Sequence, residues 1–165
     1  MKKFEKTGII KESILILPDI RSAINVGAIF RTADAVGIDK IFLTGVTPRP
    51  TDKFGRVQKD IAKSALGAEL WVPWEYEKET LSLIKKLKRE GYYIVALEQN
   101  DKSKDYREIK LAKKMVFVLG QEVAGVEKDV LKKCDEIAEI PMSGRKESLN
   151  VSVACGIFLF RIFQQ

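Results

Sequence analysis

Short apolar segments alternate with segments of helical periodicity along the chain, and this alternation constrains the fold more than any other feature. Five short segments have the composition of buried strands: residues 13–17, 41–44, 94–97, 115–119 and 136–140. Five others have the spacing of helices: residues 25–36, 57–66, 77–90, 128–133 and 149–163. Residues 68–72 form a weaker strand candidate. The alternation predicts an α/β fold in which helices cover both faces of a parallel sheet.

The size and composition of the chain are those of an ordinary globular domain. Its 165 residues, of which 45% are hydrophobic, are enough to bury a sizeable core. We find no repeat, no low-complexity tract and no flexible linker, so we expect a single domain over residues 1–165. The net charge of +6 favours a polyanionic partner, although a housekeeping protein rich in lysine would carry the same charge.

Several classes of function are excluded or disfavoured by the residues that the chain lacks. It has no histidine, which excludes histidine–metal sites and catalysis by Ser-His-Asp or Cys-His groups. Cys134 and Cys155 have no CxxC spacing, so we expect reduced, buried or half-buried thiols and no metal site. The apolar run 14–17 is too short for a signal peptide or a membrane span, which predicts a cytoplasmic protein without membrane contact.

Nucleotide-binding loops of two common kinds are also absent. Gly120 and Gly125 have the glycine spacing of a P-loop, but Val126 and Glu127 follow where lysine and serine or threonine are required. No GxGxxG sequence opens a helix after the first strand, so a nicotinamide dinucleotide site has no support.

Polar residues gather in the loops that follow the expected strands, namely residues 18–22, 45–59, 98–101, 120–122 and 141–147. Open α/β sheets bind ligands at the carboxyl ends of their strands, so we expect the functional site there. A rim of basic residues near these ends would bind phosphates: Arg21, Arg49, Lys53, Arg56, Lys59, Arg145 and Lys146. The basic run 85–89 lies on a helix and is interpreted as a solvated face.

The last expected helix, residues 149–163, is apolar on nearly every side. One face can pack on the sheet, but a small domain has little else with which to cover the other. A homodimer through this C-terminal helix is the simplest explanation, and a central helix wrapped by its own chain is the alternative.

Three segments, each at the end of an expected strand, carry a family resemblance: residues 25–33 (NVGAIFRTA), 119–122 (LGQE) and 140–154 (IPMSG followed by SLNVSVA). In order, residue type and spacing they resemble the three motifs of the SpoU (TrmH-like) RNA 2′-O-methyltransferases of the SPOUT class. Residues 63–68 (KSALGA) resemble a further family segment. The resemblance covers nearly the whole chain.

The resemblance implies a Rossmann-like SPOUT fold with a C-terminal trefoil knot, which general topology rules would not predict. It also implies transfer of a methyl group from S-adenosyl-L-methionine to a ribose 2′-hydroxyl of RNA, with tRNA favoured over rRNA. Many relatives carry an added N-terminal RNA-binding domain, which we do not expect here. Two alternatives stay open: a non-catalytic RNA-binding protein that keeps the fold, and a SPOUT enzyme that methylates a base.

The residues that match the first two motifs have both a structural and a catalytic interpretation. Asn25 lies where a helix N-cap is expected. Arg31 borders an apolar stripe, as a solvated side chain often does, but by resemblance it contacts the target ribose and its phosphate. Arginine stays protonated, so we favour phosphate clamping over action as a base. By resemblance Glu122 is the acid of the second motif, and it would hold Asn25 or Arg31 in place.

The remaining candidates concern the cofactor and the third motif. By resemblance, main-chain groups of Gly120, Ile140 and Leu149 line the S-adenosyl-L-methionine pocket, and side chains of Ile140, Met142 and Leu149 surround the adenine. Gly120 would let the cofactor approach the backbone, whereas Ile140 and Leu149 could equally be plain core. Residues 148 and 150 precede a helix, which suggests capping, and by resemblance Ser148 and Asn150 orient the arginine, the cofactor and the ribose.

Overall fold

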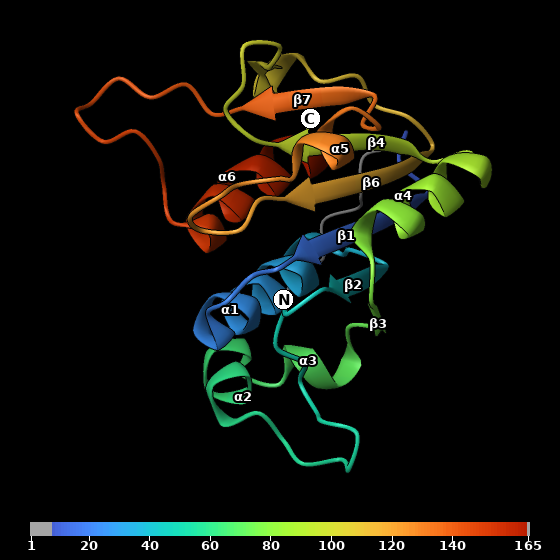
Figure 1. The fold of residues 1–165 in the computed structure, drawn as a ribbon, viewed down its shortest axis with the longest axis vertical. Helices are drawn as coiled ribbons and strands as arrows, with labels where there is room; N and C mark the ends of the chain where they lie inside the picture. The colour runs from blue at the N-terminus through green and yellow to red at the C-terminus, as the bar shows by residue number, and fades with distance from the viewer. Residues whose placement is uncertain (1–7, 165) are drawn as a thin grey trace.

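The computed structural model describes residues 8–164, in which seven strands form one sheet (Figure 1). The strands are β1 (Glu12–Pro18), β2 (Lys40–Thr44), β3 (Trp74–Glu77), β4 (Tyr93–Leu97), β5 (Lys104–Asp105), β6 (Lys114–Leu119) and β7 (Glu136–Glu139). Their order is β3-β2-β1-β6-β4-β7-β5, and all six pairings are parallel. The predicted α/β class with a parallel sheet is confirmed.

Helices cover both faces of this sheet. They are α1 (Ala23–Val36), α2 (Lys59–Ala65), α3 (Ala68–Trp71), α4 (Thr80–Arg89), α5 (Lys128–Leu131) and α6 (Val151–Phe163), with a 3₁₀ turn η1 (Tyr106–Glu108). Residues of α1, α2, α3 and α6 belong to the larger of two hydrophobic clusters, and residues of α4 and α5 belong to the smaller one. The molecule therefore has three layers, with the sheet in the middle.

The strands are continuously apolar because both of their faces are buried. In β1, Leu15 and Leu17 point into the larger cluster while Ile14 and Ile16 point into the smaller one. Successive side chains of a strand point to opposite faces, so a central strand between two helical layers needs apolar residues at every position. This is the physical reason why the sequence pattern located the central strands correctly.

The prediction of a strand over residues 68–72 is wrong, because these residues form the short helix α3 and its C-cap. Gly67 has a φ of 97° and starts a new turn directly after α2, which leaves no extended segment there. The strand comes after Pro73 instead, as β3, and its last residue is Glu77. The following helix consequently starts at Thr80 and not at residue 77.

The prediction that Asn25 caps α1 is also wrong. Ser22 is the N-cap, and its hydroxyl oxygen accepts a hydrogen bond from the backbone N–H of Asn25 at 3.2 Å. Asn25 therefore lies inside the first turn of the helix. Its side-chain amide is not used for capping and is available for contacts with other segments.

Helix α6 is buried on one side only. Phe158 meets Phe117 of β6 edge-on, with ring centroids 5.6 Å apart, and the same side of the helix packs on α1. The other side carries Val153, Ile157 and Phe160, whose side chains are 49%, 39% and 39% exposed. No segment within residues 8–164 covers this apolar face of α6.

Both cysteines are free thiols, as the sequence predicted. Cys155 is buried, and burial raises the pKa of its thiol to about 12. Cys134 is half-buried; burial first, and then the charge of Asp135, raise the pKa of its thiol to about 12. Neither thiol is ionised to any extent near neutral pH, which fits structural roles.

Two further expectations from the sequence are that no segment spans a membrane and that the chain forms a trefoil knot. Within residues 8–164, no helix combines the length and the apolar content that crossing a bilayer requires. The trefoil knot that the resemblance implies remains a prediction.

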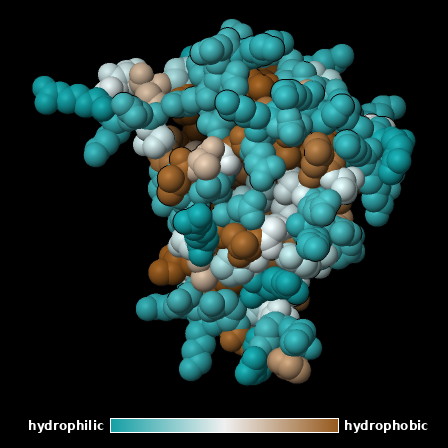
Figure 2. Space-filling view, in the orientation of Figure 1, coloured by the Kyte–Doolittle hydropathy of each residue, from teal (hydrophilic) through white to brown (hydrophobic). Residues whose placement is uncertain are grey.

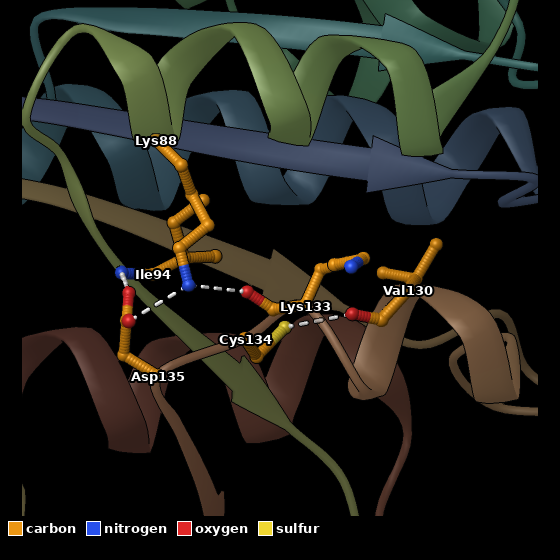
Figure 3. Close-up of polar contacts among 6 residues, drawn as sticks. All are labelled: Lys88, Ile94, Val130, Lys133, Cys134 and Asp135. Atoms are coloured by element: carbon orange, nitrogen blue, oxygen red, sulfur yellow. Dashed lines mark hydrogen bonds and ion pairs between the residues drawn. The ribbon is translucent and has the colours of Figure 1, made fainter.

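Asp135 joins three elements on the α4 side of the sheet (Figure 3). One carboxylate oxygen accepts a hydrogen bond from the backbone N–H of Ile94 in β4, and the other accepts one from Lys88 Nζ of α4, both at 2.8 Å. Lys88 Nζ also donates to the backbone carbonyl of Lys133 at 2.9 Å. Lys88 therefore belongs to a bonded cluster, while its basic neighbours on α4 are exposed, as expected for a solvated face.

We predict that Asp135→Ala lowers the free energy of unfolding by about 1–3 kcal/mol, because the amide of Ile94 loses its acceptor and Lys88 loses its counter-ion. Urea denaturation followed by circular dichroism measures this change. Asp129→Ala is the matched control, since Asp129 forms an ion pair with Lys132 at the exposed surface. Equal effects of the two substitutions would contradict the role given to Asp135.

Candidate functional site

A cavity of about 450 Å³ lies beyond the carboxyl ends of β4, β6 and β7 and is closed by the N-terminus of α6. It is lined by Leu97, Glu98, Gln99, Leu119, Gly120, Gln121, Glu122, Val123, Gly125, Glu139, Ile140, Met142, Ser148, Leu149, Asn150, Val151 and Ala154. The loop between β7 and α6 projects beside it at the left of Figure 1, and Figure 2 shows hydrophobic residues recessed at the base of that projection. The cavity is therefore where the strand-end argument placed the site.

The lining combines apolar side chains with carboxylates. Glu98, Glu122 and Glu139 are its acidic members. The volume lies in the range of small-molecule sites, roughly 300–1,000 Å³. Apolar walls suit a flat aromatic ring, and carboxylates suit a cationic centre. The cavity can hold a cofactor that has both.

Glu122 binds the loop that precedes α1. Its carboxylate accepts hydrogen bonds from the backbone N–H groups of Arg21 at 3.2 Å and Ser22 at 3.3 Å, and from Asn25 Nδ2 at 3.1 Å. Asn25 Oδ1 in turn accepts from Asn150 Nδ2 at 3.2 Å. The three motif segments therefore meet in one chain of hydrogen bonds, Glu122–Asn25–Asn150.

Asn150 is also the N-cap of α6. Its Oδ1 accepts from the backbone N–H of Ser152 at 2.9 Å and from that of Val153 at 3.4 Å. One amide side chain thus satisfies the free helix end with its oxygen and contacts Asn25 with its nitrogen. The capping role predicted for Asn150 is confirmed, and the same side chain also contacts Asn25.

The environment of Glu122 favours its ionised form. Burial alone would raise the pKa of this carboxyl, but hydrogen bonds from its own amide, from Asn25 and from the amides of Arg21 and Ser22 outweigh burial and hold the pKa below its ordinary value. Glu122 is therefore a carboxylate at neutral pH and acts as a fixed acceptor.

Glu98 was not selected from the sequence, although its loop was. Its carboxylate accepts from the backbone N–H of Val126 at 2.8 Å and from that of Gln99 at 2.8 Å. A Cβ at Gly125, whose φ is 68°, would lie 2.0 Å from this carboxylate. Only glycine fits at position 125. The hydrogen bond from Val126 to Glu98 fixes this turn, which forms part of the cavity wall.

Gly120 has a packing role that the sequence did not predict. A Cβ at this position would lie 2.9 Å from the Cα of Gly125 and 3.0 Å from Glu98 Oε2. The missing side chain therefore lets two loops and a carboxylate pack closely. Gly120 also lines the cavity, and the close approach of a cofactor to its backbone stays a prediction.

The structure brings together most of the candidate residues. Gly120, Glu122, Ile140, Met142, Ser148, Leu149 and Asn150 line the cavity, and Asn25 contacts two of them. Arg31 is not among the lining residues. It is exposed on α1, on the same helix face as the exposed Ile24 and two turns beyond it.

The basic residues do not form one continuous rim around this cavity. Arg49, Lys53, Arg56 and Lys59 line a second hollow, on the loop between β2 and α2, which shares no lining residue with the first. Arg145 and Lys146 are exposed on the loop between β7 and α6. Within residues 8–164 no group of three or more acidic or cysteine side chains is arranged to hold a metal ion.

Comparison with known proteins gives a consistent result. Residues 12–160 match the model of the SpoU rRNA Methylase family. A Staphylococcus saprophyticus protein assigned to the TrmH family of tRNA/rRNA methyltransferases is 33% identical over 153 residues, which are 93% of this chain and 59% of that protein. The chain thus spans about three fifths of the length of this curated relative.

Solved structures show the same likeness. An AdoMet-bound rRNA methyltransferase from Sinorhizobium meliloti superposes with a TM-score of 0.83 at 30% identity, over 96% of this chain and 56% of that one. The A. aeolicus TrmH/SpoU tRNA modifying enzyme superposes with a TM-score of 0.80 at 30% identity, over 92% of this chain and 74% of that one.

The depressed pKa of Glu122 leads to a prediction of pH dependence. The folded state holds this proton more weakly than the unfolded state, so the stabilisation is present above the ordinary pKa of 4.5 and is lost as the pH falls through the folded value. We expect Glu122→Gln to be less stable than the unsubstituted chain near neutral pH, and the difference to shrink below about pH 4.5.

Urea unfolding over a series of pH values measures this difference. Glu147→Gln, at an exposed position in the loop before α6, is the control and should show no such dependence. A deficit of the Glu122→Gln variant that stays constant across the acid range would contradict the interpretation.

Proposed function

The chain belongs to the SpoU rRNA Methylase family, and we propose that it binds S-adenosyl-L-methionine in the cavity and transfers the methyl group to a ribose 2′-hydroxyl of RNA. The observation that carries this proposal is the convergence of three distant segments, through Glu122, Asn25 and Asn150, at the edge of a cavity of suitable size. Solved structures similar to this one include an AdoMet-bound methyltransferase.

The residues of the cavity fit such a cofactor. Ile140, Met142 and Leu149 offer an apolar surface to an adenine ring, and their main-chain groups can bind its polar edge. Glu98 and Glu139 line the same cavity and would supply negative charge for the cationic sulfonium and ammonium groups of the cofactor. Ser103 Oγ donates to Glu139 Oε2 at 2.6 Å, which fixes that carboxylate.

When bound, the cofactor supplies an activated methyl group on a sulfonium, which is already a good leaving group. The protein therefore has mainly to align the accepting oxygen with it. Asn25 and Asn150 hold each other beside the cavity, and Glu122 fixes Asn25. Ser148 also lines the cavity, and in this proposal its hydroxyl would contact the ribose.

Arg31 has the role of a phosphate clamp in this proposal. Its guanidinium is exposed and outside the lining of the cavity, so it reaches the reacting ribose only when RNA or a second copy of the chain is bound beside α1. A planar fork of donors suits a phosphate and stabilises the negative charge that develops on the attacking oxygen.

The proposal also covers the kind of RNA that is methylated and two alternative functions. tRNA is the first RNA to test and rRNA the second, since similar proteins are named for both. A non-catalytic RNA-binding protein would bind RNA without methylating it. A base methyltransferase would leave the methyl on the nucleobase, which digestion to nucleosides and mass spectrometry distinguishes from a methylated ribose.

We also propose that two copies of the chain associate through α6. Its uncovered face, Val153, Ile157 and Phe160, is apolar, and the adjacent helix α1 adds the exposed Ile24. Burying such a surface is favourable in water. Because Arg31 lies on the same face of α1 as Ile24, association would place it at the interface between the copies.

We predict that Arg31→Ala binds S-adenosyl-L-methionine as tightly as the unsubstituted chain but loses roughly 100-fold or more of its methyl transfer to bulk tRNA. Calorimetry measures the binding, and transfer of a radiolabelled methyl group measures the activity. Arg89→Ala, which removes an exposed arginine of α4, is the matched control. Undiminished transfer by the Arg31 variant would refute the role of this residue.

We predict that Ile157→Asp converts a dimer into a monomer, because it places a charge in the centre of the apolar face of α6. Analytical ultracentrifugation measures the mass in solution. Leu70→Asp is the control, since Leu70 is an exposed leucine on α3. A monomeric unsubstituted chain, or an unchanged dimer in the Ile157 variant, would show that α6 does not form the interface.

A further inference from the structure

The loop between β2 and α2, drawn at the bottom of Figure 1, has a fixed conformation at its tip. Asp52 Oδ1 accepts from the backbone N–H groups of Phe54 at 2.8 Å and Arg56 at 3.0 Å, and Asp52 Oδ2 accepts from Arg56 Nε at 2.6 Å. Thr51 and Val57 pair across the turn as an isolated antiparallel bridge. These three hydrogen bonds and the bridge leave the tip little freedom to collapse.

The hydrogen bonds of Asp52 also lower the pKa of its carboxyl group. The backbone N–H of Arg56 is the largest influence on the pKa of Asp52 and lowers it; desolvation comes second and raises it, and the Arg56 side chain and the Phe54 amide lower it further, so that the pKa lies below its ordinary value. The carboxylate is thus committed to the turn itself. It forms an ion pair with Arg56, and the positive charge of the second hollow beyond this pair comes from Arg49, Lys53 and Lys59.

This fixed turn exposes an aromatic ring between two cations. Phe54 is 70% exposed, with Lys53 Nζ 5.0 Å and Arg56 Cζ 5.3 Å from its ring centroid. A phenylalanine at a loop tip would ordinarily lower the free energy by folding onto the protein surface. Here the backbone turn holds the ring out in solvent, so its exposure is built into the loop.

The base of the loop is held by a second pairing of the same kind. Arg49 Cζ lies 3.6 Å from the ring centroid of Tyr76 on β3, and Tyr76 donates its hydroxyl to the backbone carbonyl of Gly45 at 3.0 Å. Between base and tip lies the second hollow, of about 700 Å³, whose lining includes Arg49, Lys53, Arg56 and Lys59 and a single acid, Asp52. The loop is therefore a rigid cationic surface with one exposed aromatic ring.

We propose that this loop, residues 45–58, binds unpaired nucleotides of the RNA substrate, with a base stacked on Phe54 and the neighbouring phosphates on Lys53, Arg56 and Arg49. The inference rests on the proposed function, since it takes RNA as the substrate. Bases stack on exposed aromatic rings only where they are not already stacked within a duplex, and cations beside the ring match the phosphates on either side of the base. The loop thus adds to the catalytic cavity a separate surface that selects single-stranded regions.

The test compares Phe54→Ala with the unsubstituted chain. Fluorescence anisotropy measures the affinity for a short labelled single-stranded RNA of mixed sequence and for a duplex of the same length. We expect the dissociation constant of the variant for single-stranded RNA to rise roughly 5- to 30-fold, with little change for the duplex. Phe54→Trp should restore the affinity, because it keeps a stacking surface.

Two further variants separate stacking from charge and from general apolar contact. Lys53→Ala should weaken binding of both RNAs and reduce its dependence on salt, because it removes a phosphate contact. Leu70→Ala, which removes an exposed apolar side chain of α3 outside the loop, should change neither affinity.

The outcomes also separate this inference from the proposed function. If the unsubstituted chain methylates RNA while Phe54→Ala binds single-stranded RNA with unchanged affinity, the loop proposal is wrong. The proposed methyltransferase function then still stands. If Phe54→Ala changes the oligomeric state and leaves RNA affinity intact, the ring is a protein contact and the proposal is equally wrong. If no RNA is methylated and no cofactor binds, the proposed function itself fails, whatever the loop binds.

Discussion

The carboxylate of Glu122 is the contact on which the geometry of the site depends. It lies at the end of β6, yet it accepts hydrogen bonds from the loop before α1 and from the first turn of that helix. Through Asn25 its influence reaches the N-cap of α6. Neighbouring parallel strands bring their ends to the same edge of a sheet, but only a specific acceptor sets the distance between the loops that follow them. The sheet brings the loops to the same edge, and the hydrogen bonds of Glu122 fix how far apart they lie.

The central strands and most helices could be predicted because burial on both faces leaves an unambiguous apolar pattern. The edge of the sheet could not, since β3 and β5 are short and carry mixed residues such as Glu75 and Lys104. The prediction over residues 68–72 failed for a local reason. The positive φ of Gly67 starts a new helical turn, and an apolar run of that length fits a strand or a helix equally well.

The site was predicted in part for a similar reason. Residues at strand ends, such as Gly120, Glu122 and Ile140, follow from topology once the strands are known. Glu98 has the same placement, but nothing in its neighbouring residues reveals that its carboxylate would meet the backbone of a turn more than twenty residues later. Arg31 shows the opposite limit: the sequence motif names it, yet the folded chain leaves it outside the cavity. Pairing across long separations is what a pattern in one sequence does not encode.

Those long separations have a consequence for how the molecule is made. Asn25 and Glu122 are 97 residues apart, and Asn25 and Asn150 are 125 residues apart. Closing loops of this size costs chain entropy, which only the contacts formed afterwards can offset. We therefore expect such pairings to form late in folding. On the ribosome, α1 is synthesised long before the residues that complete its hydrogen bonds. A folding intermediate can therefore have its early strands and helices in place while it still lacks any affinity for a ligand of the cavity, which makes ligand binding a more stringent measure of complete folding than helical content.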